Sequence, residues 1–140
     1  MTMEFLQPEG WPRPTGYSSG VAAKGRMVFV SGMVGRDARG RFPTDDFAGQ
    51  AHQALKNIVV ILAQAAAKPE HIVRMTWYVI DKNEYVAAFK ELGAVYRETI
   101  GRHYPAMTVV EVSALLKPKA RVEIEVTAVI PDPPDASSKR

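Results

Sequence analysis

One segment near the end of the chain constrains the fold more than any other feature of the sequence. Along residues 121–130 (RVEIEVTAVI), polar and apolar side chains alternate from Arg121 through Ala128. A period of two places successive side chains on opposite faces of a β-strand. The apolar face consists of Val122, Ile124, Val126, Ala128 and Ile130, and the other face carries Glu123, Glu125 and Thr127. We therefore expect a sheet with one face against a hydrophobic core.

Two segments predict the helices that cover this face. Apolar residues recur at steps of three and four along residues 47–67 and again along residues 84–100. This spacing is typical of amphipathic helices with one buried stripe. Asp46 and Asp81 offer side-chain oxygens that cap the two N-termini, and Gly101 suits the end of the second helix.

Further segments rich in β-branched and aromatic residues predict the other strands. They are residues 17–23, 27–34, 72–80 and 106–112, with a short additional strand at Phe42. The resulting order, β-β-(β)-α-β-α-β-β, predicts an α+β fold with a mixed β-sheet of five to six strands and two helices packed on one face. The opposite face would then have no helix to cover it, which indicates self-association.

The length of 140 residues predicts a single domain comprising the whole chain, 1–140. We expect it to be ordered from about residue 8 to residue 131. Three prolines within residues 8–16 predict an extended loop at the start. Residues 132–140 (DPPDASSKR) have the composition of a flexible tail.

The composition excludes several kinds of chemistry. The chain has no cysteine, so disulfides, thiol catalysis and thiolate zinc sites are ruled out. Its 3 histidines lack the spacing and the carboxylate partners of a metal motif. No glycine-rich phosphate loop is present either. We therefore expect neither a metal nor a cofactor.

The distribution of charge and hydropathy bears on location and partners. Residues 1–10 lack the apolar core of a signal peptide, and the apolar stretch at residues 58–67 is too short to span a bilayer. We therefore expect a cytoplasmic protein with no membrane partner. A net charge of +3 without a run of basic residues does not favour nucleic-acid binding.

Several short motifs occur in an order and spacing that resembles a known family. They are Tyr17-Ser18-Ser19-Gly20-Val21, Met27–Gly32, Gln50–Asn57, Ile72–Thr76, Tyr104–Val112 and Val122-Glu123-Ile124-Glu125. Together they resemble the YjgF/RidA family of reactive-intermediate deaminases over about residues 17–130. The resemblance implies a chorismate-mutase-like fold and a homotrimer with small-molecule clefts between neighbouring subunits. Characterised members hydrolyse imines and enamines to a carbonyl compound and ammonia.

The resemblance also implies roles for individual residues. Glu123 matches the glutamate that helps to position or activate water, so it is the expected catalytic residue. Tyr17 and Ser31 match the tyrosine and serine that complete the substrate pocket. Met107 occupies the position of the arginine that binds the substrate carboxylate. Because a thioether has no hydrogen to donate, the substrate is expected to differ from the usual small 2-imino acids.

Two cations are candidates to replace the missing charge. Lys90 lies in the second predicted helix, at a position where the family carries a polar asparagine, and Arg36 follows the second predicted strand. The central strand also contains Trp77 and Tyr78, which are core or interface residues or else line the cleft and favour a flat ligand.

Each of these residues has a simpler structural interpretation. Glu123 lies on the polar face of a strand, Lys90 suits a solvent-facing helix position, Ser31 suits a turn, and Tyr17 suits an edge anchor. Two other functions therefore stay open beside imine hydrolysis. One is a non-enzymatic ligand-binding or regulatory trimer, and the other, less favoured, is RNA binding or endoribonuclease activity.

Overall fold

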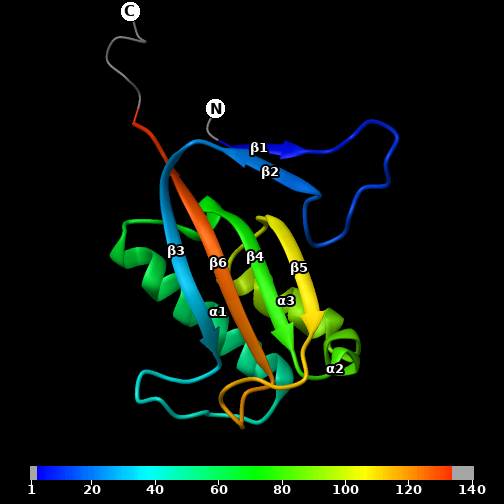
Figure 1. Ribbon diagram of the computed structural model, residues 1–140, viewed down its shortest axis with the longest axis vertical. Helices are drawn as coiled ribbons and strands as arrows, with labels where there is room; N and C mark the ends of the chain where they lie inside the picture. The colour runs from blue at the N-terminus through cyan, green and yellow to red at the C-terminus, as the bar shows by residue number, and fades with distance from the viewer. Residues whose placement is uncertain (1–2, 134–140) are drawn as a thin grey trace, which may run out of the picture.

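The computed structural model describes residues 3–133, which form six strands and two main helices with a short third one (Figure 1). The strands are β1 (Met3–Leu6), β2 (Gly20–Ala23), β3 (Gly25–Val34), β4 (Ile72–Val79), β5 (Ala106–Glu111) and β6 (Val122–Pro131). The helices are α1 (Phe47–Gln64), α2 (Lys82–Ala87) and α3 (Phe89–Thr99), and a 3-10 turn covers Pro69–His71. None of the helices within residues 3–133 combines the length and the apolar character needed to cross a bilayer.

The strands form two separate sheets. The larger sheet has the order β3-β6-β4-β5, with β4 and β5 parallel and the other neighbours antiparallel. The smaller sheet is the antiparallel pair β1-β2, which lies at one end of the larger sheet (Figure 1). The helices α1 and α3 lie together behind the larger sheet, on one face of it (Figure 1). The predicted α+β class is therefore confirmed, but its six strands are divided between a four-stranded mixed sheet and a hairpin.

The local differences from the predicted elements have identifiable causes. Strand β1 has no counterpart among the predicted elements, and it forms because residues 3–6 pair with β2. The second predicted helix is interrupted at Ala88, whose φ of −95° and ψ of 9° depart from helical values. The predicted strand at Phe42 is wrong. Its neighbourhood is a closed turn, in which the side chain of Asp37 accepts hydrogen bonds from the backbone N–H groups of Arg39 and Arg41. Residues 134–140 of the predicted tail lie outside the described part of the chain.

The hydrophobic core lies between the larger sheet and the helices. The apolar face of β6 predicted from its alternation is buried, with Val122, Ile124 and Ala128 fully inaccessible to solvent. The stripe of α1 that meets it is also buried and consists of Phe47, Ala51, Leu55, Ile58 and Leu62. A close approach between Gly35 and α1 brings the helix onto β3. A Cβ at this glycine would lie 2.6 Å from the carbonyl oxygen of Gln50, so a larger residue does not fit.

Gln50 is the one buried polar side chain identified in the core of the described residues, and it ties two loops to α1. Its amide nitrogen donates to the carbonyl oxygens of Thr44 at 3.1 Å and Lys119 at 3.0 Å. Its amide oxygen accepts from the backbone N–H of Arg121 at 2.8 Å. Three hydrogen bonds compensate the burial of the amide and fix the segment that leads into β6.

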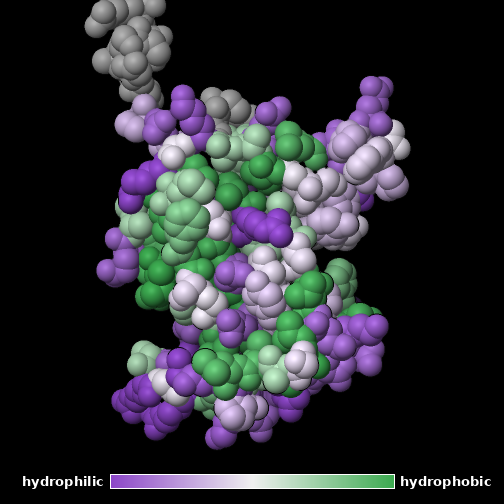
Figure 2. Space-filling model, in the orientation of Figure 1, coloured by the Kyte–Doolittle hydropathy of each residue, from purple (hydrophilic) through white to green (hydrophobic). Residues whose placement is uncertain are grey.

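The face of the larger sheet opposite the helices is not covered by any element within residues 3–133. Polar side chains from β4 and β6 pair across its middle, with Thr76 opposite Glu125 and Tyr78 opposite Glu123. Large apolar side chains also lie on this face, because Met27 is 55% exposed and Phe29 is 70% exposed on β3. Figure 2 shows this side of the molecule, with green apolar residues next to purple hydrophilic ones. We call it the open face.

Candidate functional site

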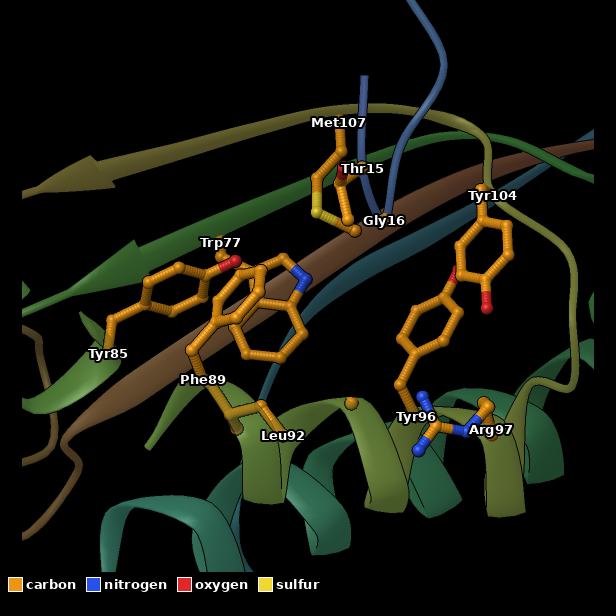
Figure 3. Close-up of a pocket in the computed structure, with 11 residues that line it drawn as sticks. Thr15, Gly16, Trp77, Tyr85, Phe89, Leu92, Tyr96, Arg97, Tyr104 and Met107 are labelled. Carbon is orange, nitrogen blue, oxygen red and sulfur yellow. The ribbon is translucent and has the colours of Figure 1, made fainter. Parts of the chain in front are cut away.

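A cavity of about 160 Å³ lies at the β5 edge of the larger sheet, between β4, β5, the helices α2 and α3, and the loop before β2 (Figure 3). We call it the edge cavity. Its walls are mainly aromatic and come from Trp77, Tyr85, Phe89, Tyr96 and Tyr104. The remaining lining residues are Thr15, Gly16, Leu92, Gly93, Arg97 and Met107. The cavity is therefore apolar with a single cationic side chain.

The pleat of the sheet explains which side chains face this cavity. Trp77 on β4 pairs with Val109 on β5, and Met107 pairs with Met75, which is fully buried in the core. These residues point to the helix side of the sheet, since alternate residues of a strand share a face. Because β5 is the edge strand, no further strand within residues 3–133 covers Met107, and its thioether forms part of the cavity wall.

Contacts between rings fix the shape of the cavity. Trp77 and Tyr85 meet edge to face with centroids 5.7 Å apart, and Tyr85 meets Phe89 at 6.1 Å. On the other side, Tyr96 stacks on Tyr104 at 5.7 Å and donates a hydrogen bond to the carbonyl of His103 at 2.6 Å. Burial raises the pKa of both Tyr85 and Tyr96, so these walls stay neutral at physiological pH. Such pre-formed walls favour a rigid ligand.

Trp77 carries an unsatisfied donor. Its side chain is only 3% exposed, yet its indole Nε1–H has no hydrogen-bond partner among the described residues. A buried donor without a partner costs about 1–3 kcal/mol. In Figure 3 this nitrogen points toward the middle of the residues that line the cavity. The donor is therefore an unsatisfied polar group directly behind the cavity wall.

Arg97 supplies the cation of the edge cavity. It lies one helical turn after Gly93, and a Cβ on Gly93 would be 3.2 Å from Nη1 of Arg97. The guanidinium is therefore folded back along α3, over the place where a side chain at 93 would lie. No hydrogen bond or ion pair within residues 3–133 occupies it. Its charge is consequently free to meet an anionic group at the cavity.

Glu123 and Ser31 lie on the opposite face of the sheet from Met107. The pairing of β3 with β6 is irregular between Val30 and Met33, and Ser31 and Gly32 form this bulge. A Cβ on Gly32 would lie 2.1 Å from Oε2 of Glu123, so the carboxylate occupies the space that this glycine leaves. Bulges of this kind re-aim side chains and are frequent next to functional sites. The structure therefore brings Glu123 and the Ser31-Gly32 segment together on the open face.

The neighbouring carboxylate on β6, that of Glu125, already accepts a hydrogen bond. The hydroxyl of Tyr78 donates a short hydrogen bond to the side chain of Glu125. This hydrogen bond raises the pKa of Tyr78, because it stabilises the neutral phenol beside an anion. The side chain of Glu123 has no hydrogen bond within the described residues, so of the two carboxylates it is the one open to an incoming molecule.

The remaining predicted residues lie in different places. Tyr17 is 45% exposed and directly follows Gly16 of the edge cavity. Its loop is held to β5 by a hydrogen bond from the Ser18 N–H to the Pro105 carbonyl at 3.0 Å. Lys90 is exposed on α3 and does not line the edge cavity, although its neighbour Phe89 does.

Arg36, the other cation considered, lines a separate hollow near the end of β3. The walls of that hollow include Gly32, Asp37 and Asn57, and it lies at the β3 edge of the sheet, opposite the β5 edge. The predicted site residues of a single chain therefore fall into two groups, which we call half-sites: one at the edge cavity with Met107 and Tyr17 nearby, and one on the open face with Glu123 and Ser31.

Sequence reasoning missed Arg97, although a signal for it exists. Phe89, Gly93 and Arg97 follow each other at steps of four, so they form one ridge on α3. Lys90 lies one position away from this ridge, which on a helix is a rotation of about 100°. Among the described residues, no group of three or more histidine, aspartate or glutamate side chains is arranged to hold a metal ion.

Fold and site together define a class: small α+β proteins with a helix-backed mixed sheet and a ligand-sized cavity at its edge. The model of the Endoribonuclease L-PSP family, which is the YjgF/RidA family, matches residues 12–130. A RutC family protein of Pyrococcus horikoshii is 32% identical over 126 residues, which is 89% of this chain and 96% of the relative.

Two further relatives extend the comparison. The 2-iminobutanoate/2-iminopropanoate deaminase of Salmonella typhimurium is 34% identical over 108 residues, which is 75% of this chain and 80% of that protein. The crystal structure of a Rid-family protein of Yersinia pestis superimposes with a TM-score of 0.79 at 30% identity, covering 93% of this chain and all of the other. The chain belongs to the YjgF/RidA family.

Proposed function

We infer that this protein hydrolyses an imine or enamine to a carbonyl compound and ammonia, at clefts between the subunits of a homotrimer. The observation that carries this proposal is the unengaged carboxylate of Glu123, which lies against the Ser31-Gly32 bulge in a member of a family that includes imine deaminases. The substrate would differ from the usual small 2-imino acids because Met107 offers no charge to a carboxylate.

In imine hydrolysis the main role of the protein is to position and activate a water molecule. The oxygen of a water molecule bonds to the imine carbon while Glu123 accepts a proton from that water. That proton passes to the imine nitrogen, which gives a tetrahedral intermediate with one hydroxyl and one amino group. The hydroxyl proton then moves to the amino nitrogen as the carbon–nitrogen bond breaks, so that ammonia leaves and a carbonyl group remains. A carboxylate within hydrogen-bond reach of the water is a suitable general base for this step. No cofactor is needed for the atoms to balance.

Assembly explains how the two half-sites would meet. Met107 and Glu123 lie on opposite faces of the same sheet, so one chain cannot bring both to one small molecule. The exposed Met27 and Phe29 on the open face favour contact with another copy of the chain. In a ring of three subunits, the open face of one would lie against the edge cavity of the next, and each cleft would receive both half-sites.

Ammonia release tests this proposal. The enzyme would be supplied with freshly generated 2-iminopropanoate and with bulkier imines, comparing the natural chain with Glu123→Gln and Met107→Arg. We expect turnover of a bulkier imine that falls about 100-fold or more in Glu123→Gln, as is usual for loss of a general base. Unchanged turnover in Glu123→Gln would refute the assigned role.

A non-enzymatic trimer that binds the same small molecules is the second candidate. The observation that favours it is Met107 at the position where the resemblance places the family's arginine. In that case ligands would bind at the clefts, and no imine would be hydrolysed faster than in buffer. Activity that appears only in Met107→Arg would support this alternative.

A further inference from the structure

We propose that the substrates are 2-imino acids with aromatic side chains, whose ring enters the edge cavity while the carboxylate on the imine carbon pairs with Arg97. This inference rests on the proposed function for the reaction, but the ligand class follows from the cavity itself. It also gives Arg97 the carboxylate-binding role for which Lys90 and Arg36 were considered.

The size of the cavity selects one ring. Its volume is about 160 Å³. An apolar cavity of about 150 Å³ in another protein holds one benzene molecule. A single six-membered ring therefore matches the volume of the edge cavity, whereas a methyl or ethyl side chain would leave part of it unfilled. Unfilled apolar volume contributes no contacts, so small imines lose binding energy here.

The walls match the faces and edges of such a ring. Trp77, Tyr85 and Phe89 already meet one another edge to face at centroid distances of 5.7 to 6.1 Å. An inserted ring continues this arrangement, which aromatic pairs prefer to a face-to-face sandwich. The polarisable thioether of Met107 makes favourable contacts with aromatic edges. Met107 thus serves as a wall for an aromatic ligand.

The polar groups at the cavity converge on an acidic ligand. The buried Nε1–H of Trp77 lacks a partner and points into the group of lining residues (Figure 3). The guanidinium of Arg97 lines the same cavity from α3 and is free of ion pairs within the described residues. A carboxylate is the common planar anion that a guanidinium binds with two parallel hydrogen bonds.

Gly93 leaves space next to the guanidinium of Arg97. The guanidinium lies where a side chain at 93 would be, with a prospective Cβ contact of 3.2 Å to Nη1. Glycine inside a helix lowers helix stability by about 1 kcal/mol relative to alanine, so space is the main advantage of a glycine at this position. Gly93 also lines the edge cavity, so the missing side chain leaves space beside Arg97 and at the cavity wall.

The experiment measures binding of phenylpyruvate, the product expected from an aromatic 2-imino acid, by isothermal titration calorimetry. Pyruvate serves as the probe with a carboxylate and no ring, and phenylacetone as the probe with a ring and no carboxylate. We expect phenylpyruvate to bind at least 10-fold more tightly than either. Arg97→Gln should weaken it by roughly 10- to 100-fold, the usual effect of losing a charge-assisted hydrogen bond.

Two further variants control for folding and for overall charge. Arg102→Gln removes the same charge from a residue that is exposed like Arg97 but does not line the cavity, and should leave binding unchanged. Gly93→Ala improves helix propensity, so it should not unfold the protein, yet it should weaken phenylpyruvate binding by crowding Arg97. Equal affinities for phenylpyruvate and pyruvate, or equal losses in Arg97→Gln and Arg102→Gln, would overturn the inference.

The outcomes also separate this inference from the proposed function. Binding of phenylpyruvate through Arg97 without ammonia release from its imine would support the ligand class and refute the hydrolase. Turnover of 2-iminopropanoate in preference to the aromatic imine, with Arg97→Gln fully active, would support the hydrolase and refute the ligand class.

Discussion

Replacing Gln50 by leucine tests whether the core amide holds the two loops onto α1. Leucine has a similar volume, so the substitution removes three hydrogen bonds without opening a large cavity. At about 1 kcal/mol each, their loss predicts a destabilisation of about 3 kcal/mol. That is a large share of the stability of a single domain, which is about 5–15 kcal/mol.

Gln53→Leu is the matched control, because it makes the same change one turn along the same helix. Gln53 is half-buried and donates to the side chain of Asn57 at 2.9 Å. A side-chain pair at this spacing on a helix contributes about 0.2–0.5 kcal/mol. The structure therefore predicts a difference of more than 2 kcal/mol between two chemically identical substitutions.

Urea unfolding followed by circular dichroism measures both free energies of unfolding. All samples are compared at one protein concentration, since self-association would shift the apparent stability. Equal slopes against urea would show that the variants unfold from equally compact states. If Gln50→Leu is within about 0.5 kcal/mol of Gln53→Leu, the three hydrogen bonds do not stabilise the loops as argued.

Three other predictions concern the open face and the cavity walls. Gly32→Ala places a Cβ where the Glu123 carboxylate lies, so turnover should fall about 10-fold or more while the melting temperature changes little; unchanged kinetics would contradict that placement. Phe29→Lys puts a charge on the exposed apolar part of the open face and should shift sedimentation toward monomer, whereas an unaltered trimer would exclude β3 from the interface. A spectrophotometric pH titration should show that three tyrosines ionise at higher pH in the folded chain than in the unfolded one. Their contribution to the free energy of unfolding should therefore be intact below a pH of about 10 and fall above it, where the unfolded chain releases these protons first. They are Tyr78, Tyr85 and Tyr96.

The alternation along β6 was enough to predict the two faces of the sheet. Each apolar position from Val122 to Ala128 is buried against the helices, and Glu123 and Glu125 point to the other side. The period-two pattern is informative here because burial acts on every second side chain in the same direction. In α1 the burial of one side of the helix acts on residues three and four positions apart, so that spacing predicted its buried residues in the same way.

Other features depend on contacts that local patterns do not encode. Strand β1 exists because residues 3–6 pair with β2, and the segment alone has no distinctive alternation. The turn at Asp37 replaces the predicted strand at Phe42, because its side chain bonds two backbone N–H groups. The grouping of Met107 with Arg97 needed the sheet register and the helix ridge together, since the two residues are on different elements.

The separation of the two half-sites was likewise beyond the sequence patterns. The resemblance to the family implied that Glu123 and Met107 belong to one pocket. Only the register of β4 with both neighbours reveals that they lie on opposite faces of the sheet. This arrangement makes assembly a requirement of the proposed function.

Subunit complementation tests most directly whether the site is built from two chains. Glu123→Gln disables the open-face half-site, and Met107→Glu disables the edge cavity by placing a negative charge in its wall. Each variant is first shown to assemble by analytical ultracentrifugation, and then the two are unfolded together and refolded as mixed oligomers. We predict that each variant alone releases ammonia about 100-fold more slowly than the natural chain, or slower still. The mixture should recover about one quarter of natural activity, because random mixing makes that share of the interfaces intact on both sides. Mixed oligomers that stay inactive would contradict a site shared between subunits.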